Sequence, residues 1–302
     1  MFKLATPHLL TGEELTGTEI QQLIDSAIYL KQQRGQAEQP RVLAGKHLAL
    51  VFDKPSLRTR LSFTIAAREL GGDVIESVGN SRKVEDPADQ MRVLQGYCHA
   101  VMVRTFSEQT LEKMQEVARV PIINGLSDLY HPCQILADLM TLKENFGSLE
   151  NLSLCYIGDG NNILHSLLLM ASAVGVNVHY YCPKAHGPNA RVLRNALNKQ
   201  HPGAIKGFDN IKAAVAGCHA VYTDVWTSMG FESTDERAFK GFQVNEALMQ
   251  HAQAEAIFLH CMPMERGKEV SHSLPDSPCS KIFQQSENRL HVQKALLLSL
   301  FT

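Results

Sequence analysis

Two short segments combine side chains suited to a phosphate with side chains suited to a carbonyl group. In Ser56-Leu-Arg-Thr-Arg60, which follows an apolar run, Ser56 can cap a helix whose first backbone N–H groups point at an anion. Arg58 and Arg60 add guanidinium groups that fit phosphate. In His131-Pro-Cys-Gln134, the imidazole can donate a hydrogen bond to a carbonyl oxygen, and the amide can bind an NH₂ group. An ordinary capped helix and a structural histidine are the competing interpretations.

Later segments carry groups suited to an amino-acid substrate. The paired amides of Gly158-Asp-Gly-Asn-Asn162 fit a carboxylate or a backbone, although asparagine also tolerates turns. Asp224, the first residue of Asp-Val-Trp-Thr-Ser-Met-Gly, either holds an ammonium group or caps a turn. Cys261 in His260-Cys-Met-Pro263 is either a thiolate nucleophile or part of a pocket lining. Arg289 either turns inward toward a phosphate or stays exposed in a helix.

Several classes of protein are disfavoured by the same sequence. Ile163 stands where the dinucleotide-binding fingerprint has its third glycine, and no acidic residue occurs between Asp159 and Asp209, so a nicotinamide enzyme is not expected. No Walker phosphate loop is present. The net charge is −2 without runs of like charge, so charge alone indicates neither nucleic-acid nor membrane binding.

Cysteine usage favours a cytoplasmic protein. The chain of 302 residues holds 7 cysteines and no C-x-x-C pair, which is atypical of a disulfide framework or a structural zinc site. We expect no signal peptide, because Glu13 and Glu14 interrupt the start of the chain before an apolar region forms. No stretch is apolar enough to predict a spanning helix.

Alternating strands and helices must position these groups. Apolar runs predict strands at 47–52, 73–78, 100–103, 120–124, 152–157, 176–182, 219–223 and 256–260. Helical spacing predicts helices at 11–34, 58–70, 86–98, 110–119, 133–146, 162–174, 188–200, 210–216, 245–253 and 287–300. The alternation predicts an α/β fold with two domains, each a parallel sheet flanked by helices. Ligands of such sheets lie at the carboxyl ends of the strands, where the segments above fall.

The ordered set of segments resembles the aspartate/ornithine carbamoyltransferase family, and most closely its ornithine-specific branch. The matching stretches cover nearly the whole chain and are Ser56–Arg60, His131–Gln134, Gly158–Asn162, Asp224–Gly230, His260–Pro263 and Glu287–Arg289. The pattern Asp-x-x-x-Ser-Met-Gly from Asp224 is the most specific, because it looks like the family's ornithine-binding signature. The resemblance implies a carbamoyl-phosphate-binding domain of residues 1–147 with the C-terminal helix 284–302 packed back on it. Residues 148–283 would then form the ornithine-binding domain.

The resemblance also implies a reaction and a set of site residues. The carbamoyl group passes from carbamoyl phosphate to the δ-amine of L-ornithine, giving L-citrulline and phosphate, with no metal or organic cofactor. This is a step of arginine biosynthesis or breakdown. The residues implied for carbamoyl phosphate are Ser56, Leu57, Arg58, Thr59, Arg104, His131, Gln134, Cys261, Met262 and Arg289. Those implied for ornithine are Asn162, Asp224, Ser228 and Met229. The catalytic groups would be Arg58, His131, Cys261 and Asp224, with Cys261 orienting the amine rather than attacking it.

A few positions depart from the family pattern. Leu57 stands where the family usually has threonine, and Met262 where it has leucine. The loop Ser77–Ala88 is shorter than usual and carries Arg82 and Lys83. In the family this loop reaches a neighbouring subunit, and the family assembly is a homotrimer or a multiple of trimers. The alternatives are a transcarbamylase for an N-acylated ornithine or putrescine, and an inactive ligand-binding relative.

Overall fold

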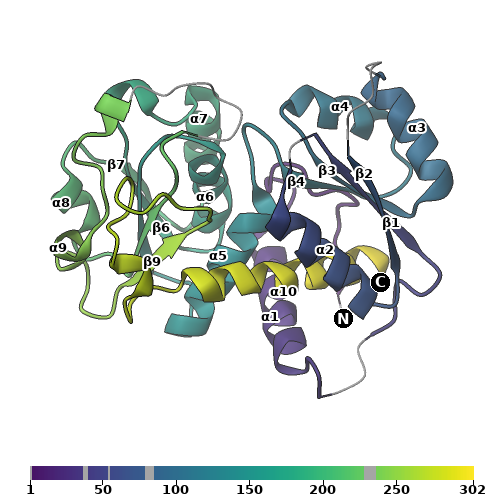
Figure 1. Ribbon diagram of the computed structural model, residues 1–302, viewed down its shortest axis with the longest axis horizontal. Helices are drawn as coiled ribbons and strands as arrows, with labels where there is room; N and C mark the ends of the chain where they lie inside the picture. The colour runs from purple at the N-terminus through teal and green to yellow at the C-terminus, as the bar shows by residue number, and fades with distance from the viewer. Residues whose placement is uncertain (1, 37–39, 54, 79–84, 228–235) are drawn as a thin grey trace. The chain divides into compact units, whose positions relative to one another are not determined.

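The computed structural model describes residues 2–36, 40–53, 55–78, 85–227 and 236–302 (Figure 1). The chain forms two compact units. The first comprises Met1–Met140 with Asn288–Thr302, and the second comprises Thr141–Glu287. Each contains one parallel sheet, as the strand–helix alternation predicts. Among the described helices, none is both long and apolar enough to cross a membrane.

The first unit is built around a sheet of four parallel strands in the order β2-β1-β3-β4. The strands are β1 (His47–Phe52), β2 (Asp73–Val78), β3 (Ala100–Arg104) and β4 (Ile122–Leu126). The helices are α1 (Gly17–Gln32), α2 (Leu57–Glu69), α3 (Pro87–Tyr97), α4 (Glu108–Val117), α5 (Pro132–Phe146) and α10 (Ile282–Phe301), of which α5 and α10 continue into the second unit. Helices α3 and α4 cover one face of the sheet (Figure 1). Met91 and Met114 of these helices belong to one buried cluster with Ala49 and Val101 of the strands.

Local sequence explains where α1 and α2 begin. Helix α1 begins at Gly17, later than the helix predicted from residue 11, because Thr16 and Glu19 form a capping box there. Helix α2 begins after Ser56, whose side chain accepts a hydrogen bond from the Thr59 backbone N–H. These caps satisfy backbone N–H groups that a helix cannot bond internally.

The C-terminal helix packs on the first unit, as expected. The Lys294 side chain is fully buried, and its Nζ lies 2.6 Å from Glu69 Oε2 on α2. The Lys31 Nζ on α1 donates to Asn288 Oδ1 over 2.8 Å. Residues at the end of the chain are thereby held against helices formed near its start.

The second unit is built around five parallel strands in the order β7-β6-β5-β8-β9. The strands are β5 (Ser153–Ile157), β6 (Asn177–Tyr181), β7 (Ile205–Gly207), β8 (Ala220–Thr223) and β9 (Ile257–His260). The helices are α6 (Asn162–Ala173), α7 (Ala190–Asn198), α8 (Ile211–Val215) and α9 (Glu246–Met249), with 3₁₀ turns η1 (Lys184–His186), η2 (Glu236–Phe239) and η3 (Leu274–Asp276). Strand β7 was not predicted, because three residues at a sheet edge leave no apolar run.

In both sheets, successive strands are added first toward one edge of the sheet and then toward the other, so each sheet has a point where the strand order reverses. In the first unit this point lies between β1 and β3, and in the second between β5 and β8. Connections leaving such neighbouring strands diverge to opposite faces, which opens a crevice at the carboxyl ends. The segments after β1 and β3 carry Ser56–Arg60 and Arg104, and those after β5 and β8 carry Gly158–Asn162 and Asp224. The topology thus places the predicted groups at the two ligand-binding edges.

Candidate active site

Buried positive charge gathers around one hydroxyl group in the first unit. The Thr59 hydroxyl, fully buried on α2, accepts a hydrogen bond from Arg289 Nη2 over 2.7 Å. Arg104 Nη1, at the end of β3, lies 3.5 Å from the same oxygen. Both guanidinium groups are buried, at 5% exposure for Arg104 and 3% for Arg289. A guanidinium keeps its charge at any physiological pH, so this cluster is suited to an anion such as phosphate.

The start of α2 adds backbone donors to the cluster. The Thr59 N–H is used by the Ser56 cap, at 3.2 Å from Ser56 Oγ. Leu57 and Arg58 supply the first two N–H groups of the helix, which have no partner within a helix. Leu57 stands where the family usually has threonine. Its side chain is 68% exposed and is therefore not part of the hydrophobic core. Its contribution to anion binding is then its backbone N–H.

His131 is buried directly before α5, close enough to Arg289 and Arg104 for their charges to act on it. Burial, together with the charges of Arg289 and Arg104, holds the pKa of His131 well below its ordinary value of 6.5. The imidazole is therefore neutral near pH 7, and a neutral imidazole carries one ring N–H, which is a hydrogen-bond donor. A neutral donor can polarise a carbonyl oxygen without placing another cation beside two guanidinium groups.

The depressed pKa of His131 predicts a pH dependence of stability. Unfolded His131 binds a proton near pH 6.5 and the folded residue does not. The unfolded state therefore takes up more protons as the pH falls, and folding stability is lost below pH 6.5 and regained as pH rises. His131→Gln should reduce this loss by up to about 1.4 kcal/mol per pH unit. Urea denaturation at pH 7.5 and 5.5 measures the difference, with the exposed His251→Gln as control. Equal slopes for wild type and His131→Gln would contradict the prediction.

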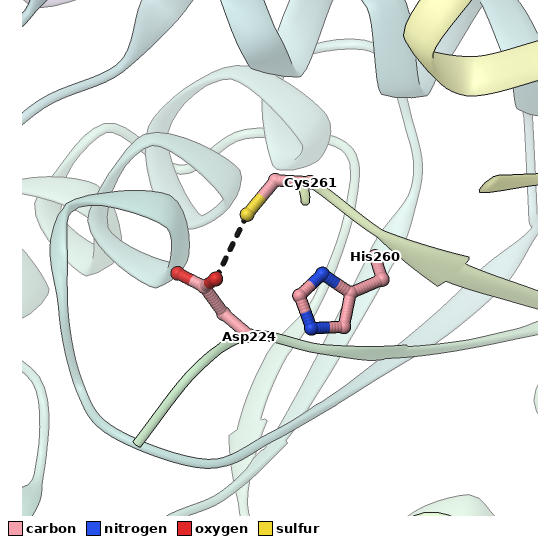
Figure 2. A group of neighbouring side chains, drawn as sticks. All are labelled: Asp224, His260 and Cys261. Atoms are coloured by element: carbon pink, nitrogen blue, oxygen red, sulfur yellow. Dashed lines mark hydrogen bonds between the residues drawn. The ribbon is translucent and has the colours of Figure 1, made fainter. Parts of the chain in front are cut away.

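In the second unit, Asp224 receives hydrogen bonds from three sides. Cys261 Sγ, after β9, donates to Asp224 Oδ1 over 2.9 Å (Figure 2). Asn161 Nδ2 donates to Asp224 Oδ2 over 2.8 Å, and the Val225 N–H donates to Oδ1 over 2.8 Å. The carboxylate is 6% exposed. Its orientation is thus determined by its own neighbour Val225 and by groups from two distant segments.

Asn161 is itself held in place on both sides of its amide. Its Oδ1 caps α6 by accepting from the N–H groups of Ile163 and Leu164. The Tyr156 hydroxyl lies 3.1 Å from the same oxygen. Burial and the nearby charge of Asp224 raise the pKa of Tyr156 well above its ordinary value, so the phenol remains protonated and can donate. With Oδ1 occupied, the amide must present its NH₂ group to Asp224.

His260 lies beside this carboxylate (Figure 2), but its hydrogen bonds go to other residues. The ligand-type atoms of Asp224, His260 and Cys261 all lie within 4.8 Å of one another, a spacing compatible with a metal ion. Both ring nitrogens of His260 are engaged, however: Nδ1 accepts from the Met262 N–H over 2.9 Å, and Nε2 lies 3.0 Å from Glu269 Oε1. The imidazole therefore supports the turn that carries Cys261, and has no nitrogen available to a metal.

The structure separates the predicted residues into two groups, one in each unit. Thr59, Arg104 and Arg289 touch in the first unit, with His131 within range of their charge. Asp224 and Cys261 touch in the second. Gln134 lies in the first turn of α5, three residues after His131, and Ser56, Leu57 and Arg58 lie at the start of α2. Met262 follows Cys261, with a φ of 57°. Ser228 and Met229, like Arg82 and Lys83, lie outside the described residues.

Sequence reasoning pointed to the pair of asparagines without deciding between them, and it did not single out Asp138. Asn161, rather than its neighbour Asn162, contacts Asp224. Asp138, one helical turn after Gln134, accepts from its amide over 2.8 Å. The signal for Asn161 was its place directly before a helix, which is typical of a capping residue. The signal for Asp138 was an acidic residue on the apolar helix 133–146.

Comparisons with known proteins cover both units. Residues 7–144 match the family described as aspartate/ornithine carbamoyltransferase, carbamoyl-P binding domain, and residues 150–300 match its Asp/Orn binding domain. An ornithine carbamoyltransferase of Oceanobacillus iheyensis is 44% identical over 96% of this chain and 93% of its own. The solved ornithine carbamoyltransferase of Pyrococcus furiosus is 39% identical, with a TM-score of 0.91 over 98% and 97% of the two chains. An N-acetyl-L-ornithine transcarbamylase structure is 28% identical, with a TM-score of 0.86 over 98% of this chain and 100% of its own. With both units matched in sequence and fold, the chain belongs to the aspartate/ornithine carbamoyltransferase family.

Proposed function

We propose that the protein transfers the carbamoyl group of carbamoyl phosphate to the δ-amine of L-ornithine, producing L-citrulline and phosphate. The observation that carries this proposal is the pairing of Asp224 with Cys261 in the second unit. A carboxylate next to a thiol is suited to a substrate that carries ammonium groups. The relatives named ornithine carbamoyltransferase, at 44% and 43% identity, support the same acceptor.

The first unit supplies the groups that a carbamoyl-phosphate site needs. We assign carbamoyl phosphate to the first unit and ornithine to the second; the domain bounds expected from the resemblance, 1–147 with 284–302 and 148–283, differ from the bounds of these units by seven residues and four residues. Phosphate would be bound by the start of α2 and by the guanidinium groups of Arg58 and Arg104. Neutral His131, Arg58 and Thr59 would polarise the carbonyl oxygen and stabilise the oxyanion of the tetrahedral intermediate. Carbamoyl phosphate is already activated, so the protein's task is electrostatic and orientational.

The second unit must deliver an uncharged amine. A free alkyl amine has a pKa of about 10.4, so little of it is nucleophilic near pH 7. We assign Asn162, Asp224, Ser228 and Met229 to the α-amino and carboxylate groups of ornithine. Cys261 directs its thiol proton at Asp224 and orients the δ-amine of ornithine. The δ-amine loses a proton during the reaction, and the leaving phosphate accepts that amine proton. No covalent intermediate on sulfur is required.

Three competing activities can be separated in one assay. A colour assay for ureido products should respond to carbamoyl phosphate with ornithine, and far less with acetylornithine or putrescine. Product formation with acetylornithine or with putrescine, but not with ornithine, would show that ornithine is not the acceptor. No product with any of the three would indicate an inactive ligand-binding relative. Among the solved structures, the identity is 28% to the acetylornithine enzyme and 39% to the ornithine enzyme of Pyrococcus furiosus, which favours ornithine.

We infer that the protein is cytoplasmic and assembles as a homotrimer or a multiple of trimers. All seven cysteines lie within the described residues and are thiols rather than disulfides, as is typical of a reducing compartment. Apolar side chains are exposed where α2 lies beside the edge strand β2: Leu61 at 50% and Ile75 at 48% exposure. The Arg60–Glu76 ion pair, at 3.1 Å, joins the same two elements. Exposed apolar groups on an unpaired sheet edge are typical of an interface between subunits.

Charges placed on this surface should break the assembly. The wild-type mass by light scattering should be about 100 kDa or a multiple of it, for three chains of 33.5 kDa. Leu61→Asp combined with Ile75→Asp should shift the mass toward one chain, because buried unpaired charges cost several kcal/mol. Leu197→Asp, at a leucine of the second unit with 53% exposure, is the matched control and should leave the mass unchanged. A double variant that keeps the wild-type mass would place the interface elsewhere.

A further inference from the structure

Two buried polar side chains on α5 face each other one turn apart. Gln134 is 1% exposed and Asp138 is fully buried. Gln134 Nε2 donates to Asp138 Oδ1 over 2.8 Å. Residues four apart lie on the same face of a helix, so the contact is built into the sequence of α5.

This hydrogen bond selects one of the two orientations of the glutamine amide. A carboxylate oxygen accepts hydrogen bonds and cannot donate them, so the NH₂ group must face Asp138. The amide oxygen then points the other way. Gln134 Oε1 is buried and makes no hydrogen bond with any residue in the part of the chain that the structure describes. A buried amide oxygen without a donor is unfavourable, and the site is therefore one that a donor would complete.

The chemistry of the carbamoyl donor identifies the group that can donate a hydrogen bond to Gln134 Oε1. Resting on the function proposed above, the ligand of the first unit is carbamoyl phosphate, whose NH₂ group is its one nitrogen donor. The carbonyl and phosphate oxygens accept hydrogen bonds and have Arg58, Arg104 and His131 as partners. An amide oxygen discriminates an NH₂ group from a methyl group of similar size, because the methyl group leaves the buried oxygen unpaired.

We propose that Asp138 is a positioning residue that orients the Gln134 amide so that Gln134 Oε1 recognises the carbamoyl NH₂ group. The pair thereby selects carbamoyl phosphate against acyl phosphates of the same shape. Asp138 itself touches no substrate in this arrangement. Its effect passes through the orientation of one neighbouring amide.

Two stable probes isolate the NH₂ group. Phosphonoacetamide carries an amide and acetonylphosphonate a methyl ketone, while both retain a phosphonate and a carbonyl oxygen. Calorimetric titration of the full-length wild-type protein should show tighter binding of phosphonoacetamide. Asp138→Asn is isosteric and lets its own NH₂ group face Gln134, which turns the Gln134 amide over. This variant should bind phosphonoacetamide about tenfold more weakly, the order of one hydrogen bond, and its affinity for acetonylphosphonate should be unchanged.

A matched control lies on the same helix. Glu144 Oε2 accepts from Gln284 Nε2 over 2.8 Å, an amide–carboxylate contact of the same kind in the second unit. Glu144→Gln should leave the affinities of both probes unchanged. Asp138→Ser removes the carboxylate and lets the Gln134 amide rotate, so it should also reduce the preference for phosphonoacetamide. This second variant tests the proposal if Asp138→Asn does not fold.

The outcomes separate this proposal from the proposed function. An unchanged affinity for phosphonoacetamide in folded Asp138→Asn, or equal losses for both probes, would leave Asp138 a structural residue and overturn the proposal. A wild-type protein that binds both probes equally and forms no citrulline would instead overturn the carbamoyl-phosphate function. Retained citrulline synthesis with a lost probe preference in the Asp138 variants supports both.

Discussion

Arg58→Gly should lower the kcat for citrulline formation by about 10³-fold while the protein remains folded. Arg58 lies in the first turn of α2, half-buried beside the Ser56 cap. Its charge is assigned to the oxygen that becomes negative in the tetrahedral intermediate, and loss of one oxyanion donor costs about 10²–10³-fold. The guanidinium also binds the leaving phosphate, which adds to the loss. Steady-state rates at saturating substrates measure the effect.

The control for this prediction is another arginine of the same helix. Arg68 is exposed in the last turn of α2, and Arg68→Gly carries the same cost of about 1 kcal/mol for glycine in a helix. Its kcat should match that of wild type. An Arg58→Gly enzyme within tenfold of wild type would remove Arg58 from the chemical step.

Asp224→Asn should lower kcat/KM for ornithine by about 100-fold or more, the scale of losing a charged hydrogen-bond partner. The carboxylate is buried and oriented by Asn161 and Cys261, so the substitution changes charge with little change in shape. An asparagine at this position would also place an NH₂ group against the amide donor of Asn161 or the thiol of Cys261. The KM for carbamoyl phosphate should change less, because the groups assigned to its phosphate and carbonyl oxygens belong to the first unit.

Asp209→Asn provides the matched control in the second unit. Asp209 is exposed, and its replacement should leave both substrates unaffected. Binding of phosphonoacetamide to Asp224→Asn tests separately that the first unit is intact. Equal losses for ornithine and carbamoyl phosphate would mean that Asp224 supports the turn after β8 rather than the ammonium group.

The sequence by itself determined the α/β class, the parallel strands and most element boundaries. Apolar runs such as His47–Phe52 and Ser153–Ile157 are buried on both faces and cannot satisfy a helical period, so local pattern and tertiary burial agree. Capping chemistry is equally local: Ser56 begins α2 through a contact with Thr59, three residues away. The ordered motifs were enough to suggest the family.

Only the tertiary structure decided which motif residues meet and which neighbours orient them. Arg289 reaches Thr59 across 230 residues of sequence, because α10 returns to the first unit. Asn161 and Asp224, 63 residues apart, are joined because β5 and β8 are adjacent strands. Which of two consecutive asparagines caps α6 depends on backbone geometry at one residue. That Gln134 Oε1 has no hydrogen-bond partner among the described residues depends on how α5 is buried. Spacing along a chain encodes periodicity, whereas a hydrogen bond between distant residues depends on how whole elements pack.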